Sequence, residues 1–461
     1  MRATSLFGSS STSAGFDAGL AFNVAPRLNT FSKNSIIALV ARLATVATTL
    51  TVSAFAARSF TGEEFGLWAI FQSVLLIGQN MDLGLRYGMG NRLAALTALP
   101  EEERADQIRE VYLAVFNTLA VFGVITALVV GLVSGFLPWS EWLNIHQPDL
   151  ALSAPRLMSQ VGALLLLSMP GALAATVYFA NQEIAAAGWV SVFNALLLLA
   201  GLVVSTRLLM FDDVVLVYFA SNLGYSLLVT FVLWRRKRWS WAWLGFRRQW
   251  SLISGFLTPS LRFFGLTLAS ILTGVVGTLV AGTVFGLVVA GHFSLMQRFF
   301  SFLHTIHMAV LSPMAPEYTR LAGGGHWDRL REAHLRMLRY LWPAVFVLLA
   351  GGIWVLHPWL LRMWTGLNIA DYKLAAILWL WTAMQGWTNT YSVVLNSLGL
   401  VGFQGVIALL MIVPSVLLPY YLSQQFGQGG VAWGLVLCQL PVILILPRMT
   451  RTALTRQLCK V

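Results

Sequence analysis

Three arginines lie inside long apolar stretches of this sequence, where an ionised side chain is costly. Arg42, Arg86 and Arg298 are surrounded by runs of Ala, Leu, Val and Phe. An ionisable residue in such a stretch usually marks a binding site, an ion path or an ion pair. A guanidinium can donate two parallel hydrogen bonds to phosphate oxygens. Arginines around a buried cavity therefore favour an anionic ligand, and a diphosphate in particular.

Hydroxyl side chains recur at helical spacing around two of these arginines. At 3.6 residues per turn, the residues that share a helix face with Arg42 are Ser35, Thr45, Thr49 and Ser53. Those that share a face with Arg298 are Ser294, Ser301 and Thr305. Such stripes are suited to lining a wet cavity, and an ion pair between Arg42 and an acid on another helix is the alternative. We predict that the substrate-binding residues are Arg42, Arg298, Thr45, Thr49, Ser294 and Ser301.

Asp82 and Arg86 stand four residues apart near the end of one apolar run. Opposite charges at this spacing face each other on a helix, and we predict an intrahelical ion pair. Asp82 is also the only carboxylate inside a predicted span. A role in proton coupling is therefore the alternative for this residue.

Two histidines and two cysteines are the remaining candidates for site chemistry. His304 and His307, three residues apart, have a spacing that suits a metal or a proton relay, but hydrogen-bonded packing is the favoured interpretation. Cys438 and Cys459 form neither a metal-binding pattern nor a disulfide framework. The sequence predicts no metal, no cofactor and no catalytic residue.

The composition indicates a membrane protein. Of 461 residues, 57% are hydrophobic and 10% are charged, against about 25% charged residues in a typical soluble domain. The net charge of +12 resides in short connectors between apolar runs. No stripe of basic residues alternates with aromatic residues that could stack on bases, so the sequence does not predict nucleic-acid binding.

The apolar runs are long enough to cross a bilayer as helices. A span needs about 20 apolar residues, and its backbone must be hydrogen-bonded within the protein. The short alternating segments of a β-barrel are missing from this sequence. The twelve predicted spans are 34–57, 65–88, 111–136, 158–181, 185–208, 214–234, 262–285, 290–312, 338–357, 374–396, 402–422 and 428–447.

The distribution of Lys and Arg predicts the orientation of these spans. With a cytoplasmic N-terminus, 22 of the 30 basic residues fall on the cytoplasmic side, 5 fall outside and 3 lie in spans. Because cytoplasmic loops are enriched in Lys and Arg, both termini are predicted to be cytoplasmic.

The chain resembles itself at an offset of 228 residues. Phe65 and Leu67 align with Phe293 and Leu295, and each half has a polar stretch after its second span. We predict an all-α polytopic protein with two six-helix pseudo-repeat halves around a central cavity. The predicted divisions are a disordered cytoplasmic tail over 1–33, halves over 34–234 and 262–447, a basic linker over 235–261 and a tail over 448–461.

The stretch from Arg42 to Ala95 resembles the opening of the polysaccharide transporters of the MOP superfamily, which include the Wzx-type O-antigen and exopolysaccharide flippases. The resembling features are an arginine in the first span, an Ala-Arg turn, the sequence GEEFGLW, and DLGL followed by NRLA. The segment LNSLGLVGFQG near residue 400 also fits this family. The two extra C-terminal spans expected of a lipid II flippase are missing from the predicted layout.

This resemblance implies a flippase that moves undecaprenyl-diphosphate-linked oligosaccharide across a bacterial inner membrane by alternating access. It implies that Arg42 and Arg298 hold the diphosphate. The product would feed the synthesis of a lipopolysaccharide, capsule or exopolysaccharide. A polysaccharide polymerase and a chain-length regulator are then possible partners.

Two other functions remain open from the sequence. A MATE-type cation or drug exporter has the same size and span count, but it would favour an acid in the first span, which has none. A membrane-bound polysaccharide-modifying enzyme is the second alternative. Polymerases and ligases resemble chains with a large outer loop, whereas the longest predicted outer loop here covers 137–157. An acyltransferase would use His304 or His307 as a base, yet no second catalytic group stands beside them.

Overall fold

The computed structural model describes residues 28–96, 100–181, 183–312 and 314–458, and every regular element in these ranges is a helix. Seven helical stretches are long and apolar enough to cross a membrane. Their outward-facing side chains are large and apolar, as at Leu128 and Leu132 of α4, which are 62% and 68% exposed. Side chains of this kind belong in contact with lipid, so the chain is a multi-pass membrane protein.

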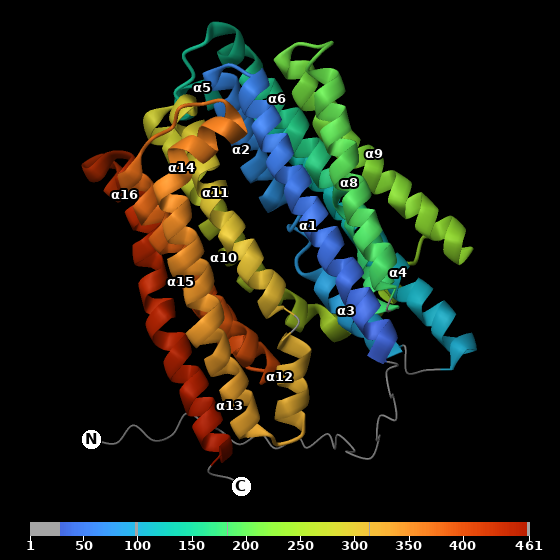
Figure 1. Ribbon diagram of the computed structural model, residues 1–461. Helices are drawn as coiled ribbons and strands as arrows, with labels where there is room; N and C mark the ends of the chain where they lie inside the picture. The colour runs from blue at the N-terminus through green and yellow to red at the C-terminus, as the bar shows by residue number, and fades with distance from the viewer. Residues whose placement is uncertain (1–27, 97–99, 182, 313, 459–461) are drawn as a thin grey trace, which may run out of the picture.

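The helices gather into two groups that lie side by side (Figure 1). The first group, coloured blue to green, consists of α1 (Leu28–Ser59), α2 (Gly62–Gly78), α3 (Leu85–Leu96), α4 (Glu101–Ser134), α5 (Trp139–Trp142), α6 (Pro148–Ser168), the 3₁₀ turn η1 (Met169–Gly171), α7 (Ala172–Ala180), α8 (Ile184–Ser205) and α9 (Phe211–Lys237).

The second group, coloured yellow to red, begins with a long helix that also contacts the first group. It consists of α10 (Phe246–Phe285), α11 (Leu287–Leu311), α12 (Met314–Gly323), α13 (Trp327–Arg336), the π-helical segments η2 (Met337–Leu341) and η3 (Ala344–Leu349), α14 (Ala350–Thr365), α15 (Tyr372–Ser397) and α16 (Val401–Leu458). Within α16, Gly427 has a φ of 62°, so this element is two helices joined at a kink.

The twelve predicted spans all overlap helices, but two of them are interrupted and a third, 338–357, contains the π-helical segments η2 and η3. The predicted span 65–88 stops at Gly78 and resumes at Leu85. The predicted span 158–181 passes through η1, where Pro170 has no N–H to continue the helix. The predicted linker 235–261 is partly helical, because α9 continues to Lys237 and α10 begins at Phe246. Residues 1–27 of the predicted tail lie outside the described residues.

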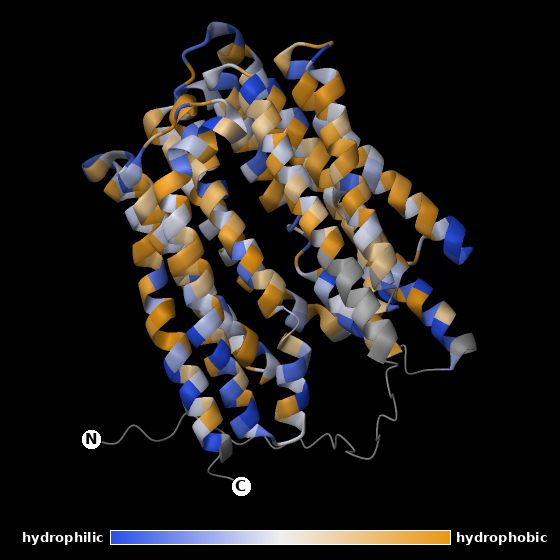
Figure 2. Ribbon diagram, in the orientation of Figure 1, coloured by the Kyte–Doolittle hydropathy of each residue, from blue (hydrophilic) through white to orange (hydrophobic). Residues whose placement is uncertain are grey.

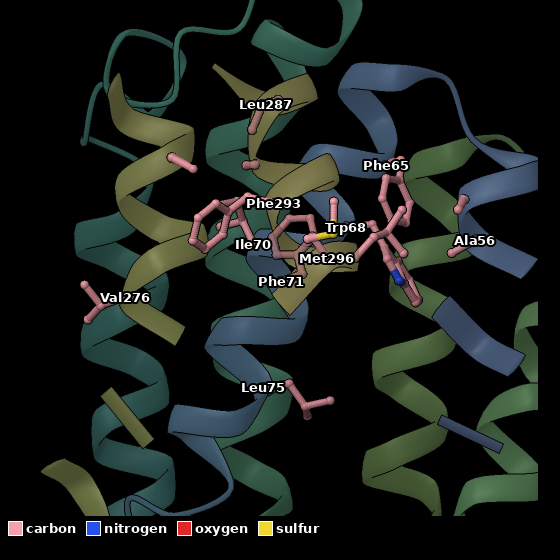
Figure 3. Close-up of a cluster of buried hydrophobic side chains, with 14 of the residues drawn as sticks. Ala56, Phe65, Trp68, Ile70, Phe71, Leu75, Val276, Leu287, Phe293 and Met296 are labelled. Carbon is pink, nitrogen blue, oxygen red and sulfur yellow. The ribbon is translucent and has the colours of Figure 1, made fainter. Parts of the chain in front are cut away.

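The two groups meet in an apolar contact between α2 and α11 (Figure 3). Phe65 and Phe293, which the internal alignment pairs, are both buried there. The helices approach so closely that a Cβ on Gly66 would lie 1.9 Å from the carbonyl oxygen of Leu287. A Cβ on Gly291 would lie 2.7 Å from the ring of Phe65. Small residues permit this close approach.

Polar contacts close the end of the molecule above this apolar contact. The Arg58 guanidinium donates to the carbonyl oxygen of Met363 at 2.5 Å, and the Trp364 indole donates to that of Leu50 at 3.1 Å. Both bonds join α1 to α14. Beside them, the Asn144 amide donates to the carbonyl oxygen of Thr283 at 2.8 Å.

At the opposite end, where α1 begins and α16 ends, the two groups diverge (Figure 1). Hydrophilic residues concentrate at this end, along α13 and the last turns of α16 (Figure 2). The helix α10 crosses from one group to the other here, and Arg248 near its start pairs with Glu110 of α4 at 2.6 Å. The protein is therefore joined tightly at one end, while at the end where α1 begins and α16 ends its groups stand apart except where α10 meets the first group.

Candidate functional site

A cavity of about 540 Å³ lies within the first group of helices. It is bounded by α1, α2, the start of α3, the end of α6, η1, the start of α7, α8 and α9, and one residue of α11 completes its wall. We call it the arginine cavity. Its polar lining residues are Thr45, Thr49, Gln72, Gln79, Arg86, Ser168, Ser191, Asn194, Tyr218, Asn222, Tyr225, Ser226 and Arg298.

Arg298 reaches this cavity from the other helix group. Its Nη1 donates a hydrogen bond of 2.6 Å to Oγ of Ser53 on α1. Ser53 is only 1% exposed, so the acceptor is fixed by its surroundings. The α2–α11 contact sets the position of α11, and α11 in turn presents the guanidinium to a cavity built by other helices.

The arginine cavity is positively charged. Among the described residues that line it, Arg86 and Arg298 are the charged ones, and none is an Asp or Glu. Asp82 lies in an adjoining cavity of about 380 Å³, where it pairs with Arg86. The charge of Arg86 is therefore neutralised in part by Asp82. Arg298 faces the cavity with a neutral hydrogen-bond acceptor, the hydroxyl of Ser53.

Arg86 is held at a break between α2 and α3. Leu83 and Gly84 both have a positive φ, 53° and 72°, and a Cβ on Gly84 would lie 2.0 Å from the carbonyl oxygen of Ser260. Asp82 accepts the Gly84 N–H at 2.9 Å and pairs with Arg86 at 3.2 Å. The ion pair is present, but the chain between its partners is not helical, contrary to the intrahelical arrangement that we expected. The close approach of α10 favours glycine at this turn.

Neutral hydrogen-bonding groups line the wall formed by the end of α6, η1, α8 and α9. The Asn222 amide donates to Oγ of Ser168 at 3.0 Å, and the Ser226 hydroxyl donates to the carbonyl oxygen of Ser168 at 2.7 Å. The buried Oδ1 of Asn194 has no partner among the described residues. Asn194 and Asn222 stand inside apolar runs of the sequence, and a polar side chain in such a run is a signal that it faces a cavity or another helix.

The structure groups only some of the residues that the sequence proposed for one site. Thr45 and Thr49 line the arginine cavity together with Arg298. Ser301 lines a different cavity, and Ser294 is almost fully buried and lines neither of them. Arg42 belongs to α1, but its side chain lies outside the described residues.

The two histidines have neighbours on α15. Nε2 of His307 lies 3.2 Å from Oγ1 of Thr390, and Nε2 of His304 lies 3.3 Å from Nδ2 of Asn389. Within the described residues, no group of three His, Cys, Asp or Glu side chains is placed to hold a metal ion. These contacts agree with hydrogen-bonded packing.

Comparison with known proteins identifies the fold. Neither the protein-family models nor the curated proteins match this sequence. Among solved structures, a multidrug resistance MATE family transporter of the MOP superfamily, in its inward-facing conformation, superposes with a TM-score of 0.63. The match has 13% identity and covers 92% of this chain and 98% of that one. The chain has the fold of the MATE transporters.

Two further solved structures have the same fold. A mutant MATE transporter from Vibrio cholerae has a TM-score of 0.61 and 16% identity, with 93% of this chain and 97% of that chain covered. A MOP superfamily transporter from Pyrococcus furiosus has a TM-score of 0.58 and 12% identity, with 92% and 95% covered. The latter is described as having a binding pocket of reverse polarity that suggests a different function. At these identities the likeness shows the fold alone, so the expected MOP superfamily and the finer Wzx-type assignment both stay proposals.

Proposed function

We propose that this protein is a flippase that exports an undecaprenyl-diphosphate-linked oligosaccharide across a bacterial inner membrane. The observation that carries this proposal is the charge of the arginine cavity, whose charged lining residues among those described are Arg86 and Arg298. In a low-dielectric cavity an uncompensated guanidinium favours an anionic ligand strongly. A diphosphate supplies the paired oxygens that a guanidinium binds best.

The proposed layout is twelve crossings in two six-helix halves. The halves are 34–234 and 262–447, the segment 235–261 links them, and the tails and this linker lie in the cytoplasm. The excess of basic residues at these segments supports that orientation. The end at which the two groups diverge then faces the cytoplasm, where the lipid-linked sugar is assembled.

The contacts that close the opposite end suit alternating access. Opening toward the outside requires the bonds of Arg58 to Met363 and of Trp364 to Leu50 to break. Each is a single hydrogen bond to a backbone carbonyl, worth about 0.5–3 kcal/mol. A charged headgroup that binds the outward-open state more tightly than the closed state would offset the loss of these bonds.

A MATE-type exporter of cations or drugs is the second candidate, and the likeness to multidrug transporters favours it. A cation in the arginine cavity would meet Arg298 without a carboxylate from the described lining residues. The charge of the cavity therefore favours the anionic substrate. The helical fold shared with transporters gives no support to a polysaccharide-modifying enzyme.

Replacement of Arg298 tests the proposal in cells. In a strain that depends on this protein for surface polysaccharide, Arg298→Ala should lower surface glycan at least about tenfold, whereas Arg298→Lys should retain part of it. Arg247→Ala, which removes an exposed arginine of the basic linker, is the matched control. Unchanged glycan in Arg298→Ala, with resistance to cationic dyes lost instead, would favour the cation exporter. A polysaccharide polymerase and a chain-length regulator are the proposed partners for the exported product.

A further inference from the structure

A second cavity, of about 330 Å³, lies within the other helix group, between α10, α11, α15 and α16. We call it the amide cavity. Its polar lining residues are Ser270, Thr273, Ser301, His304, Trp381, Gln385, Thr388, Asn389, Ser392, Gln404 and Gln439. None of the described residues that line it is Asp, Glu, Lys or Arg.

Several of these side chains retain unused hydrogen-bonding capacity. Within the described part of the chain, the partly buried side chains of Ser301, Gln385 and Gln439 make no hydrogen bond, and neither does the exposed hydroxyl of Ser270. The indole N–H of Trp381 is buried without a partner, and the Trp381 side chain is only 1% exposed. Polar groups buried in an apolar environment cost free energy unless a ligand or water satisfies them. This cavity is therefore built to receive a polar molecule.

The residue types specify an uncharged ligand rich in hydroxyl groups. Amides and hydroxyls both donate and accept, which matches the alternating donors and acceptors of a sugar. An anion or a cation would find no Asp, Glu, Lys or Arg of opposite charge among the described lining residues. An apolar ligand would leave the amides of Gln385 and Gln439 unsatisfied. The apolar side chains of Leu266, Ile407 and Met411, which also line the cavity, fit the C–H faces of a pyranose ring.

The two cavities are related through α11. Arg298 lines the arginine cavity, and Ser301, three residues later on the same helix, lines the amide cavity. At 1.5 Å per residue, these positions differ by about 4.5 Å along the helix axis. A ligand with a charged group followed by neutral sugars has the chemistry to occupy both places.

We propose that the amide cavity binds uncharged sugar residues of the transported substrate, while the arginine cavity holds its diphosphate. This inference rests on the proposed flippase function. It adds a division of the substrate between the two cavities. The glycan is recognised by the amide cavity and the charged headgroup by the arginine cavity, to which α11 of the second group contributes Arg298.

Binding to the full-length protein in nanodiscs tests the division with three probes. They are undecaprenyl diphosphate, the undecaprenyl-diphosphate oligosaccharide extracted from the producing cells, and the free oligosaccharide released from it. We expect the double variant Gln385→Leu/Gln439→Leu to bind the sugar-bearing lipid and the free oligosaccharide about tenfold more weakly, the loss expected for two neutral hydrogen bonds. Binding of undecaprenyl diphosphate should not change.

Two further variants control for folding. Gln424→Leu removes an exposed amide that does not line the cavity and should leave all three affinities unchanged. Ser270→Ala/Ser301→Ala removes only two oxygen atoms. Like the double Gln variant, it should weaken the binding of the two sugar-bearing probes. Wild-type protein that binds no oligosaccharide, or cavity variants that bind every probe like wild type, would overturn the amide-cavity inference.

Failure of the proposed function gives a different pattern. If undecaprenyl diphosphate does not bind, or binds Arg298→Ala as well as wild type, the diphosphate assignment is wrong. The free oligosaccharide still reports on the amide cavity in that case, because its binding does not involve Arg298.

Discussion

The guanidinium of Arg298 on α11 donates a hydrogen bond of 2.6 Å to the hydroxyl of Ser53 on α1, 245 residues away. This bond joins the two helix groups at the wall of the arginine cavity. Ser53 is a neutral acceptor, and Arg298 has no carboxylate partner in the described ranges. The guanidinium therefore keeps its capacity to bind an anion, and a bound diphosphate would replace Ser53 as its acceptor.

Removing this acceptor should destabilise the protein. We expect Ser53→Ala to lower the free energy of unfolding by about 1–2 kcal/mol, because Arg298 loses its hydrogen-bond partner. Thermal unfolding in detergent measures this change, and Ser53→Thr, which keeps a hydroxyl, is the control. Added inorganic diphosphate should raise the thermal unfolding midpoint of Ser53→Ala more than that of Ser53→Thr. Equal midpoints for all three proteins would show that the bond contributes nothing.

Asp82 should act by positioning Arg86. Because Asp82 holds both the Gly84 N–H and the guanidinium, we expect Asp82→Asn to lower transport by at most about fivefold, the size of a partly exposed ion pair. Arg86→Ala should cause a larger loss, since it removes positive charge from the cavity. Transport assayed across a pH range separates this role from proton coupling. Abolished transport in Asp82→Asn, together with a lost response to a proton gradient, would support coupling instead.

The close contact of α2 and α11 should tolerate no added methyl group. A Cβ on Gly66 would lie 1.9 Å from the Leu287 carbonyl oxygen, so Gly66→Ala must shift one helix. We expect a loss of about 1–3 kcal/mol in unfolding free energy. Gly224→Ala is the matched control, because its Cβ would meet nothing within 4 Å. A stable Gly66→Ala protein with full transport would contradict this packing.

Breaking the closed end should open the arginine cavity to the far side of the membrane. We expect Arg58→Ala/Trp364→Phe to shift the population toward that state, since two bonds between α1 and α14 are lost. The reporter is Thr49→Cys in a background without the native cysteines, labelled by an impermeant thiol reagent in oriented vesicles. The rate of labelling from outside should rise severalfold, because losing one or two hydrogen bonds shifts the conformational equilibrium by about that factor. Labelling that stays confined to the cytoplasmic side would argue against this gate.

Much of the helical layout follows from the sequence, because lipid demands long apolar runs. The positions of Thr45 and Thr49 on one cavity wall likewise follow from helical spacing on α1. The break at Leu83 and Gly84 does not, since it depends on the close approach of Ser260 from α10. Such a contact between distant segments leaves no periodic signal in the sequence.

The site was predicted less well than the fold for the same reason. Helical spacing grouped Ser301 with Arg298, but α11 lies between two cavities, and residues three positions apart face different ones. The bond between Arg298 and Ser53 depends on how the two groups of helices pack. Spacing within one helix predicts which residues share a face but leaves open which cavity that face lines.

The binding of the lipid diphosphate by Arg298 carries the proposed function. Its most direct test is flipping by the purified protein in liposomes loaded with undecaprenyl-diphosphate oligosaccharide, followed by the access of an external glycosidase to the sugar. We expect wild-type protein to expose the sugar, Arg298→Lys to do so more slowly, and Arg298→Ala to fall to the rate of protein-free liposomes. An Arg298→Ala protein that flips the lipid at the wild-type rate would contradict the account.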